Sequence, residues 1–173
     1  MNEKIRMMYS EAQVDARIRE LGAAISADLD GEEVHLVCVL KGASFFACEL
    51  AKRMTVPVYM DFMCVSSYGN DTRSSGEVRI VKDLDTSVEG KHVLIAEDII
   101  DSGNTLHFLL EEFRKRGAAD VKICALLSKP DRREADVTAD YIGYVIPDVF
   151  VVGYGLDYAQ KYRNLPYIGV LDI

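Results

Sequence analysis

The chain has 173 residues, of which 49% are hydrophobic and 28% are charged, and its net charge is −8. This length suits one globular domain with a substantial core, so we expect a single domain over residues 1–173. The acidic balance argues against a nucleic-acid surface, and no apolar run approaches the roughly 18 residues of a membrane helix. The N-terminus does not resemble a signal peptide, and the four cysteines form no C-x-x-C pair. We therefore expect a cytoplasmic protein with free, buried thiols that binds neither nucleic acid nor membranes.

Apolar periodicity predicts strands and helices that alternate along the chain. Ser10 and Gln13 have the spacing of a capping box and open an amphipathic helix that ends at Gly31. Two more helices are expected, over residues 43–54 and 106–116. Strands are expected over residues 35–40, 58–65, 78–81, 93–96, 121–127, 141–146 and 150–152, with a short one inside 162–173. This order predicts an α/β fold in which a mostly parallel central sheet is flanked by helices on both faces.

The most informative stretch spans residues 93–106. An apolar run is followed by the adjacent acids Glu97 and Asp98, then by two apolar residues, Asp101, and Ser-Gly-Asn-Thr at residues 102–105. Open α/β sheets bind ligands at the carboxyl ends of their strands, and N–H groups at a helix start make a phosphate cradle. Acids beside a phosphate would repel it unless they bind hydroxyls or a divalent cation. The stretch therefore favours a phosphorylated sugar with Mg²⁺, whereas an acidic turn without a ligand would leave the three clustered acids without a packing purpose.

This stretch resembles the phosphoribosyl-pyrophosphate motif of the type I phosphoribosyltransferases, with its two acids, two apolar residues and Asp-Ser/Thr-Gly-x-Thr. The resemblance implies that family's fold, with a small hood and a flexible lid loop, and Mg²⁺ as cofactor. It implies that Asp101 is the catalytic base, which would accept a purine ring proton. Asn104 stands at the one position that varies in the family, and its backbone N–H can still serve a phosphate. The residues implied to bind the ribose and its 5′-phosphate are Glu97, Asp98, Asp101, Ser102, Gly103, Asn104 and Thr105.

A second polar turn follows the expected strand over residues 35–40. A cation and a glycine at a strand's carboxyl end suit a diphosphate, because glycine lets the backbone approach closely. Leu40, Lys41 and Gly42 resemble the pyrophosphate loop of purine phosphoribosyltransferases, in which the peptide between the first two would be cis. Arg163 would clamp the pyrophosphate. From the residues alone, a solvated Lys41 remains an alternative.

Lys129 follows another apolar strand at the same end of the predicted sheet. Taken alone it is an ordinary surface lysine, but Leu-Leu-Ser-Lys resembles the family site whose ammonium donates to the 6-oxo group of a purine. Of the two arginines that follow, Arg133 is favoured over Arg132 to reach the base or the diphosphate. An obligate donor at Lys129 suits a 6-oxo and not a 6-amino group.

Residues 146–158 resemble the base-binding hood of hypoxanthine-guanine phosphoribosyltransferases, which is built from N-terminal and C-terminal segments. Phe150 would stack on the base, the backbone of Val151 would pair with its edge, and Asp157 would hold a second Mg²⁺ through water, so the implied metal residues are Glu97, Asp98 and Asp157. From the residues alone, Phe150 is equally consistent with a core position on a strand.

The polar loop over residues 66–76 completes the resemblance, because Ser67 and Tyr68 match the Ser-Tyr pair of the family's lid. The resemblance implies a purine-salvage enzyme that transfers 5-phosphoribosyl from phosphoribosyl pyrophosphate to N9 of hypoxanthine and guanine, giving IMP or GMP and pyrophosphate. The family forms dimers and tetramers, so a homo-oligomer is expected. The sequence does not rank hypoxanthine, guanine and xanthine, which differ at the purine 2-position.

Three alternative functions account for fewer of these residues. A regulator that only senses phosphoribosyl pyrophosphate would not need Asp101, Lys129 and the hood together. An aspartate phosphatase requires two acids in a D-x-D spacing, whereas two residues separate Asp98 from Asp101. A pyrimidine or adenine phosphoribosyltransferase shares the central motif but does not account for Lys129.

Overall fold

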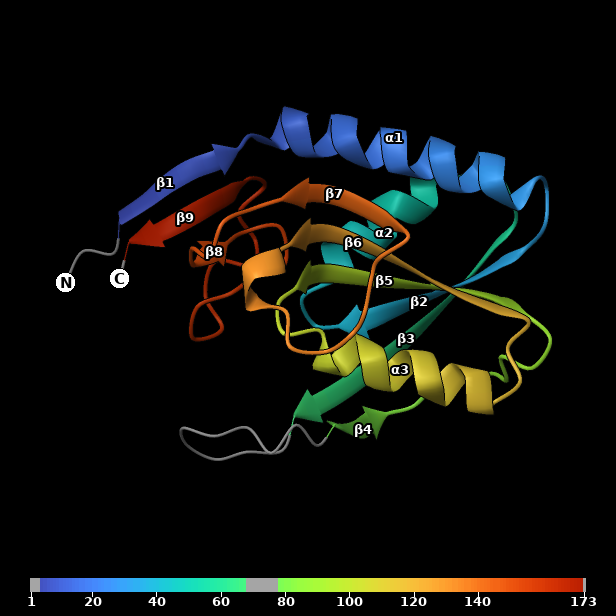
Figure 1. The fold of residues 1–173 in the computed structure, drawn as a ribbon. Helices are drawn as coiled ribbons and strands as arrows, with labels where there is room; N and C mark the ends of the chain where they lie inside the picture. The colour runs from blue at the N-terminus through green and yellow to red at the C-terminus, as the bar shows by residue number, and fades with distance from the viewer. Residues whose placement is uncertain (1–3, 68–77, 173) are drawn as a thin grey trace.

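The computed structural model of the protein describes residues 4–67 and 78–172, which form two sheets and three α-helices (Figure 1). Residues 68–76 of the predicted lid loop, including Tyr68, lie outside the described residues, while Ser66 and Ser67, which were also predicted to belong to it, end a strand. Within these residues, no helix is both long and apolar enough to cross a membrane.

The larger sheet has six strands in the spatial order β4-β3-β2-β5-β6-β7, and all neighbours are parallel except β3 and β4. Its middle strands are apolar and buried on both faces, as expected of a parallel sheet covered by helices. The prediction of a mostly parallel central sheet is confirmed. The strands are β2 (Val34–Leu40), β3 (Val58–Ser67), β4 (Val78–Lys82), β5 (His92–Ile100), β6 (Asp120–Ser128) and β7 (Tyr141–Val145).

Helices cover both faces of this sheet (Figure 1). Helices α1 (Glu11–Leu29) and α2 (Ser44–Arg53) pack on one face, and α3 (Asn104–Lys115) packs on the other. Each face has its own core, with Phe46 under the first pair and Phe113 under α3, both fully buried.

The predicted start of α1 is confirmed, because Ser10 and Gln13 form a reciprocal capping box. The helix ends at Leu29, earlier than predicted, because Asp30 already adopts the left-handed conformation, with φ of 46°.

The smaller sheet joins the two ends of the chain. Its order is β1-β9-β8, with β1 (Lys4–Tyr9) and β8 (Val151–Val152) each antiparallel to β9 (Ile168–Asp172). The prediction that residues 150–152 complete the central sheet was wrong. A two-residue strand has no periodicity of its own, so its sheet is decided by the backbone of β9, where Val151 faces Val170. The strand β1 has no counterpart among the predicted elements.

All four cysteines are free. Cys38 and Cys124 are buried in strands of the central sheet, whereas Cys48 is exposed on α2, so the prediction of buried thiols fails at that position.

Candidate active site

The paired acids lie inside β5, not after it. We predicted that the strand ends at Ala96, but its pairing with β6 continues through Glu97 to Ile100. Glu97 is only 9% exposed and Asp98 is partly buried. Burial raises the pKa of Glu97 well above its usual value, and the charge of Asp98 raises it further. Burial also raises the pKa of Asp98. The strand therefore holds two adjacent carboxyl groups in a place that disfavours their charges.

The loop after β5 turns directly into α3. Gly103 precedes the helix with φ of 85°, and a Cβ there would lie 2.5 Å from the Val137 side chain, so only glycine fits. The first N–H groups of a 12-residue helix thus face the same edge of the sheet as the acids. The loop and the strand end line a cavity of about 160 Å³, formed by Glu97, Ile99, Ile100, Asp101, Ser102, Gly103, Thr105 and Leu106.

The turn after β2 packs against the acids. The Leu40–Lys41 peptide bond is cis, and a Cβ on Gly42 would lie 1.8 Å from Oδ2 of Asp98. A Cβ on Gly155 would in turn lie 2.0 Å from the carbonyl oxygen of Gly42. These distances leave no room for a side chain at either glycine, so the Gly42 backbone lies against the Asp98 side chain and against the backbone of the loop after β8.

Two cations and an acid converge beside this contact. Arg163 Nη2 lies 2.8 Å from Asp157 Oδ1, and Arg163 Nη1 donates to the Gly155 carbonyl at 2.7 Å. Lys41 Nζ donates to Oε1 of Gln160 at 3.3 Å, and Arg163 Nη2 lies 3.4 Å from the same oxygen. Lys41 and Arg163 were both predicted to contact pyrophosphate, but Gln160, which links them, was not predicted.

The segment predicted to bind a base has one buried cation and one exposed ring. Lys129 is only 7% exposed, and its Nζ lies 3.7 Å from Asp148 Oδ1. Phe150 is 41% exposed and meets Tyr158 edge to face, so it is not a core residue. The next residue, Val151, is buried where β8 pairs with β9.

Asp101 is paired with an arginine of the turn after β6. Arg132 Nε donates to Asp101 Oδ1 at 3.1 Å, and its Nη1 lies 3.7 Å from Asp148 Oδ2. Arg133 instead donates to the Ser128 hydroxyl at 2.9 Å. The structure thus places Arg132 against Asp101 and Asp148, and a contact of Arg133 with the base or the diphosphate stays a prediction. Charges alternate along this edge from Asp101 to Lys129, with Asp148 as a member that the sequence did not single out.

Comparison with known proteins gives one consistent family. The model of the phosphoribosyl transferase domain matches residues 7–159. A hypoxanthine-guanine phosphoribosyltransferase of Bacillus subtilis (strain 168) is 55% identical over 166 residues, covering 96% of this chain and 92% of that protein. The chain belongs to the phosphoribosyltransferase family. Its similarity to a second hypoxanthine-guanine phosphoribosyltransferase, from Streptococcus thermophilus (strain CNRZ 1066), is 50% over 166 residues, with the same coverage.

The fold of this phosphoribosyltransferase agrees with solved structures. A hypoxanthine phosphoribosyltransferase of Staphylococcus aureus superposes with a TM-score of 0.93 at 47% identity, covering 96% of this chain and 91% of that one. The predicted family and fold class are therefore confirmed, including the mostly parallel sheet between helices.

The predicted metal residues do not form one cage. Among residues 4–67 and 78–172, no group of three or more His, Cys, Asp and Glu side chains is arranged to hold a metal. Glu97 and Asp98 are adjacent, whereas Asp157 is held by Arg163 and by the backbone N–H of Gln160. Mg²⁺ commonly uses one or two carboxylates together with substrate phosphates and water. The hard oxygen donors of Glu97 and Asp98 fit that mode of binding.

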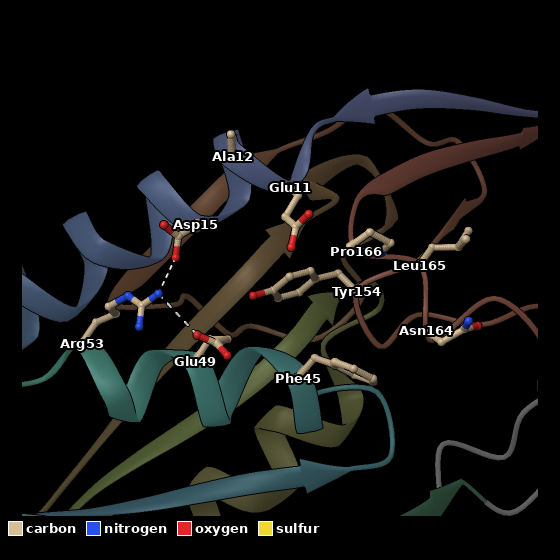
Figure 2. Close-up of a pocket in the computed structure, with 10 residues that line it drawn as sticks. All are labelled: Glu11, Ala12, Asp15, Phe45, Glu49, Arg53, Tyr154, Asn164, Leu165 and Pro166. Carbon is tan, nitrogen blue, oxygen red and sulfur yellow. Dashed lines mark hydrogen bonds and ion pairs between the residues drawn. The ribbon is translucent and has the colours of Figure 1, made fainter.

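A larger cavity is lined in part by the residue 153–166 segment. Figure 2 shows its lining side chains, which come from α1, α2 and the loop before β9, and its volume is about 570 Å³. Arg53 crosses it to contact Asp15 at 2.5 Å and Glu49 at 3.4 Å. Arg53, Asp15 and Glu49 thus join the two helices, and none of the predicted site residues lines the cavity. We place function at the carboxyl edge of the central sheet instead.

Proposed function

We propose that this phosphoribosyltransferase transfers the 5-phosphoribosyl group of phosphoribosyl pyrophosphate to N9 of hypoxanthine and of guanine. The products are IMP or GMP and pyrophosphate, which makes the reaction one of purine salvage. The observation that carries the proposal is the meeting, at one sheet edge, of buried acids on β5, two converging cations and the buried Lys129. The names of the Bacillus and Streptococcus relatives support the same substrates.

Binding of phosphoribosyl pyrophosphate uses the edge formed by β5 and α3. The N–H groups of residues 101–105, with the hydroxyls of Ser102 and Thr105, anchor the 5′-phosphate at the helix start. Glu97 and Asp98 accept hydrogen bonds from the ribose 2′- and 3′-hydroxyls. Because the phosphate is bound away from the reacting carbon, its binding energy holds the ribose in line for attack.

Departure of pyrophosphate leaves positive character on the ribose and negative charge on the leaving group. Lys41 and Arg163 stabilise that anion, and the Gly42 backbone approaches it closely. Glu97 and Asp98 would hold Mg²⁺, and Asp157 would hold a second ion through water; these ions would add positive charge beside the pyrophosphate. Burial raises the pKa values of Glu97 and Asp98, and a bound cation would favour their ionised forms.

The purine occupies the side of the site formed by residues 129 and 148–158. The Lys129 ammonium donates to the 6-oxo group, Phe150 stacks on the ring, and the backbone of Val151 pairs with the base edge. Asp101 accepts a purine ring proton, at N7, as the bond to N9 forms. Arg132 donates to Oδ1 of the same carboxylate, so the second oxygen, Oδ2, is the one proposed to accept the proton.

The predictions on organisation belong to the same proposal. We infer that residues 1–173 act as one domain in the cytoplasm and associate as a homo-oligomer, a dimer or a tetramer. Exposed Phe45 on α2, next to exposed Cys48, supports association, since subunits commonly bury such side chains.

A spectrophotometric assay with phosphoribosyl pyrophosphate and Mg²⁺ tests the proposal, with hypoxanthine, guanine, xanthine and adenine offered separately. We expect nucleotide from the 6-oxopurines and none from adenine, because Lys129 offers a donor where adenine needs an acceptor. Nucleotide from adenine would contradict the role of Lys129. No nucleotide from any base, despite binding of phosphoribosyl pyrophosphate, would favour a ligand-sensing regulator.

A further inference from the structure

The tight turn of residues 158–161, beside the site, has a backbone conformation that is unfavourable for its two central residues. Tyr158 and Lys161 exchange two backbone hydrogen bonds, of 3.1 and 2.9 Å, around the central residues Ala159 and Gln160. Both central residues have positive φ, 51° and 66°. A two-residue hairpin loop with two positive φ angles is the type I′ geometry, for which Asn-Gly is the favoured pair.

Neither central residue is the glycine or asparagine that this geometry favours. A Cβ is sterically disfavoured in the left-handed region, so glycine at position 160 would suit the backbone better than glutamine. A side chain kept in a disfavoured conformation is a reason to look for a function of that side chain.

The Gln160 side chain has such a use. Its Oε1 accepts from Lys41 Nζ at 3.3 Å and lies 3.4 Å from Arg163 Nη2, while its backbone N–H donates to Asp157 Oδ2 at 2.8 Å. The link to Lys41 spans 119 positions of sequence and joins the turn after β2 to the loop after β8. One neutral oxygen thus lies between two cations that would otherwise repel each other.

The two cations depend on Gln160 to different extents. Arg163 is also held by Asp157 and by the Gly155 carbonyl. For the Lys41 ammonium, Gln160 is the one hydrogen-bond partner found within residues 4–67 and 78–172. Loss of the amide would therefore free Lys41 more than Arg163.

We propose that Gln160 is a positioning residue for the pyrophosphate group, a role that rests on the function proposed above. Its amide oxygen holds the Lys41 and Arg163 side chains close to one position. An oxygen of the incoming pyrophosphate then occupies that position in place of the amide oxygen. Because the amide is neutral, it is displaced without charge repulsion, and the cations are already ordered when the anion arrives. Binding then loses less side-chain entropy than it would with a freely rotating lysine.

Two glycine variants of the same turn test this role. Gln160→Gly removes the amide and relieves the strained φ, whereas Ala159→Gly relieves strain at the neighbouring position and leaves the amide in place. Both are expected to keep or raise the melting temperature, so a failure to fold does not confuse the result.

Calorimetric titration with Mg²⁺-pyrophosphate, and KM values for both substrates, provide the readouts. For Gln160→Gly we expect a roughly tenfold rise in the pyrophosphate Kd and in KM for phosphoribosyl pyrophosphate, because a hydrogen bond to a charged group is lost. KM for hypoxanthine is expected to stay within about twofold, since this contact does not order the purine side. Ala159→Gly should match the wild type in all three.

Equal pyrophosphate affinity in the two variants would overturn the role of Gln160. A fall in hypoxanthine affinity as large as that for pyrophosphate would also overturn it, because it would indicate a general loss of structure. If the wild type formed no nucleotide, the proposed function would fail, yet the pyrophosphate titration would still test Gln160 by itself.

Discussion

Two buried acidic centres lie on strands separated only by β2, and they differ in how their oxygens are satisfied. Asp61, on β3, is 2% exposed and accepts from the backbone N–H groups of Phe62, Asp85 and Thr86 at 2.8, 3.0 and 3.3 Å. Burial would raise the pKa of Asp61, but these donors outweigh burial and lower it. The pKa of Glu97 on β5 is raised, because burial and the Asp98 charge meet few opposing donors.

Asp61 is a structural acid, whereas Glu97 and Asp98 are available to a ligand under the function proposed above. At Asp61 the protein supplies the donors, and the carboxylate fixes the turn at residues 85–86 beside the sheet. Glu97 and Asp98 accept from the backbone N–H groups of Asp98 and Ile99, at 3.2 and 2.8 Å, and their side chains also interact with each other. Two adjacent carboxyl groups with few donors are costly to ionise, so we propose that hydroxyls or a cation of a ligand complete this pair.

Asp98→Asn should show most clearly that the Glu97–Asp98 pair differs from Asp61, because it is expected to lower activity without lowering stability. Removal of a like charge beside Glu97 is expected to leave the melting temperature unchanged or higher, while kcat/KM falls by about 10²- to 10³-fold as a group at the reacting ribose is lost. Thermal melts and initial rates on the same preparation measure both. A clear drop in melting temperature would show that Asp98 is structural, like Asp61.

Asp101→Asn extends the comparison to a partly exposed acid at the same edge. If Asp101 is the general base, kcat should fall by about 10²-fold or more, with phosphoribosyl pyrophosphate affinity kept within a few-fold. Steady-state kinetics and a binding titration give the two values. Unchanged turnover would remove Asp101 from the role.

Asp61→Asn should show the reverse pattern. The substitution loses a charge that accepts several N–H groups and places an NH₂ against them, so the free energy of unfolding should fall by about 2–3 kcal/mol. Activity measured well below the melting temperature should stay near wild type. Denaturant unfolding measures the first and the purine assay the second; a variant that is stable but inactive would contradict the structural role.

Lys129→Met tests whether a buried cation without a close acidic partner also contacts a ligand. Its nearest acid is 3.7 Å away, and methionine fills a similar volume without a donor. KM for hypoxanthine should rise about tenfold, while that for phosphoribosyl pyrophosphate changes little. If only phosphoribosyl pyrophosphate affinity were lost, Lys129 would not be a purine ligand.

The pH dependence of stability gives the smallest expected effect, and the two centres contribute to it with opposite signs. Burial lowers the pKa of His35, aided by Lys91 and opposed by Asp61, which lies 3.4 Å away, and by the charge of Glu33. The unfolded chain therefore binds a proton more readily than the folded one, and the stability from neutral His35 is lost as pH falls below 6.5.

Glu97 and Asp98 act in the other direction. Their pKa values are raised by folding, so acidification from neutral pH toward their ordinary values adds stability. Denaturant midpoints at about pH 7.5 and about pH 5.5 should show that His35→Gln loses less stability on acidification than the wild type. Asp98→Asn should lose more, and identical shifts in all three proteins would contradict both assignments.

Features set by neighbouring residues could be predicted from the sequence. The capping box of Ser10 and Gln13, the apolar strands of the central sheet and the loop of residues 101–105 all depend on short spacings. The loop's motif also indicated the family, which the relatives confirm. These features needed no knowledge of distant partners.

Features set by distant partners could not be predicted. β5 runs on through the acids because Ile99 and Ile100 pair with β6, and β8 joins β9 rather than the central sheet. Gln160 acquires its contacts from a turn with positive φ angles and from a lysine 119 residues away. Asp148 is recognised as part of the site only because the folded chain brings Lys129 and Arg132 next to it.

The pairing within the small sheet constrains when this protein can finish folding as it is synthesised. The first described strand, β1, pairs with β9, and Lys4 faces Asp172 across that ladder (Figure 1). β8, which follows exposed Phe150, also pairs with β9. A ribosome that has translated only as far as residue 160 has already synthesised every strand of the central sheet and the whole of residues 101–105, but not β9. The chain at that point contains the whole phosphate loop, but Val151 still lacks its neighbouring strand, so the part of the site proposed to bind the base is completed only after β9 is made and emerges.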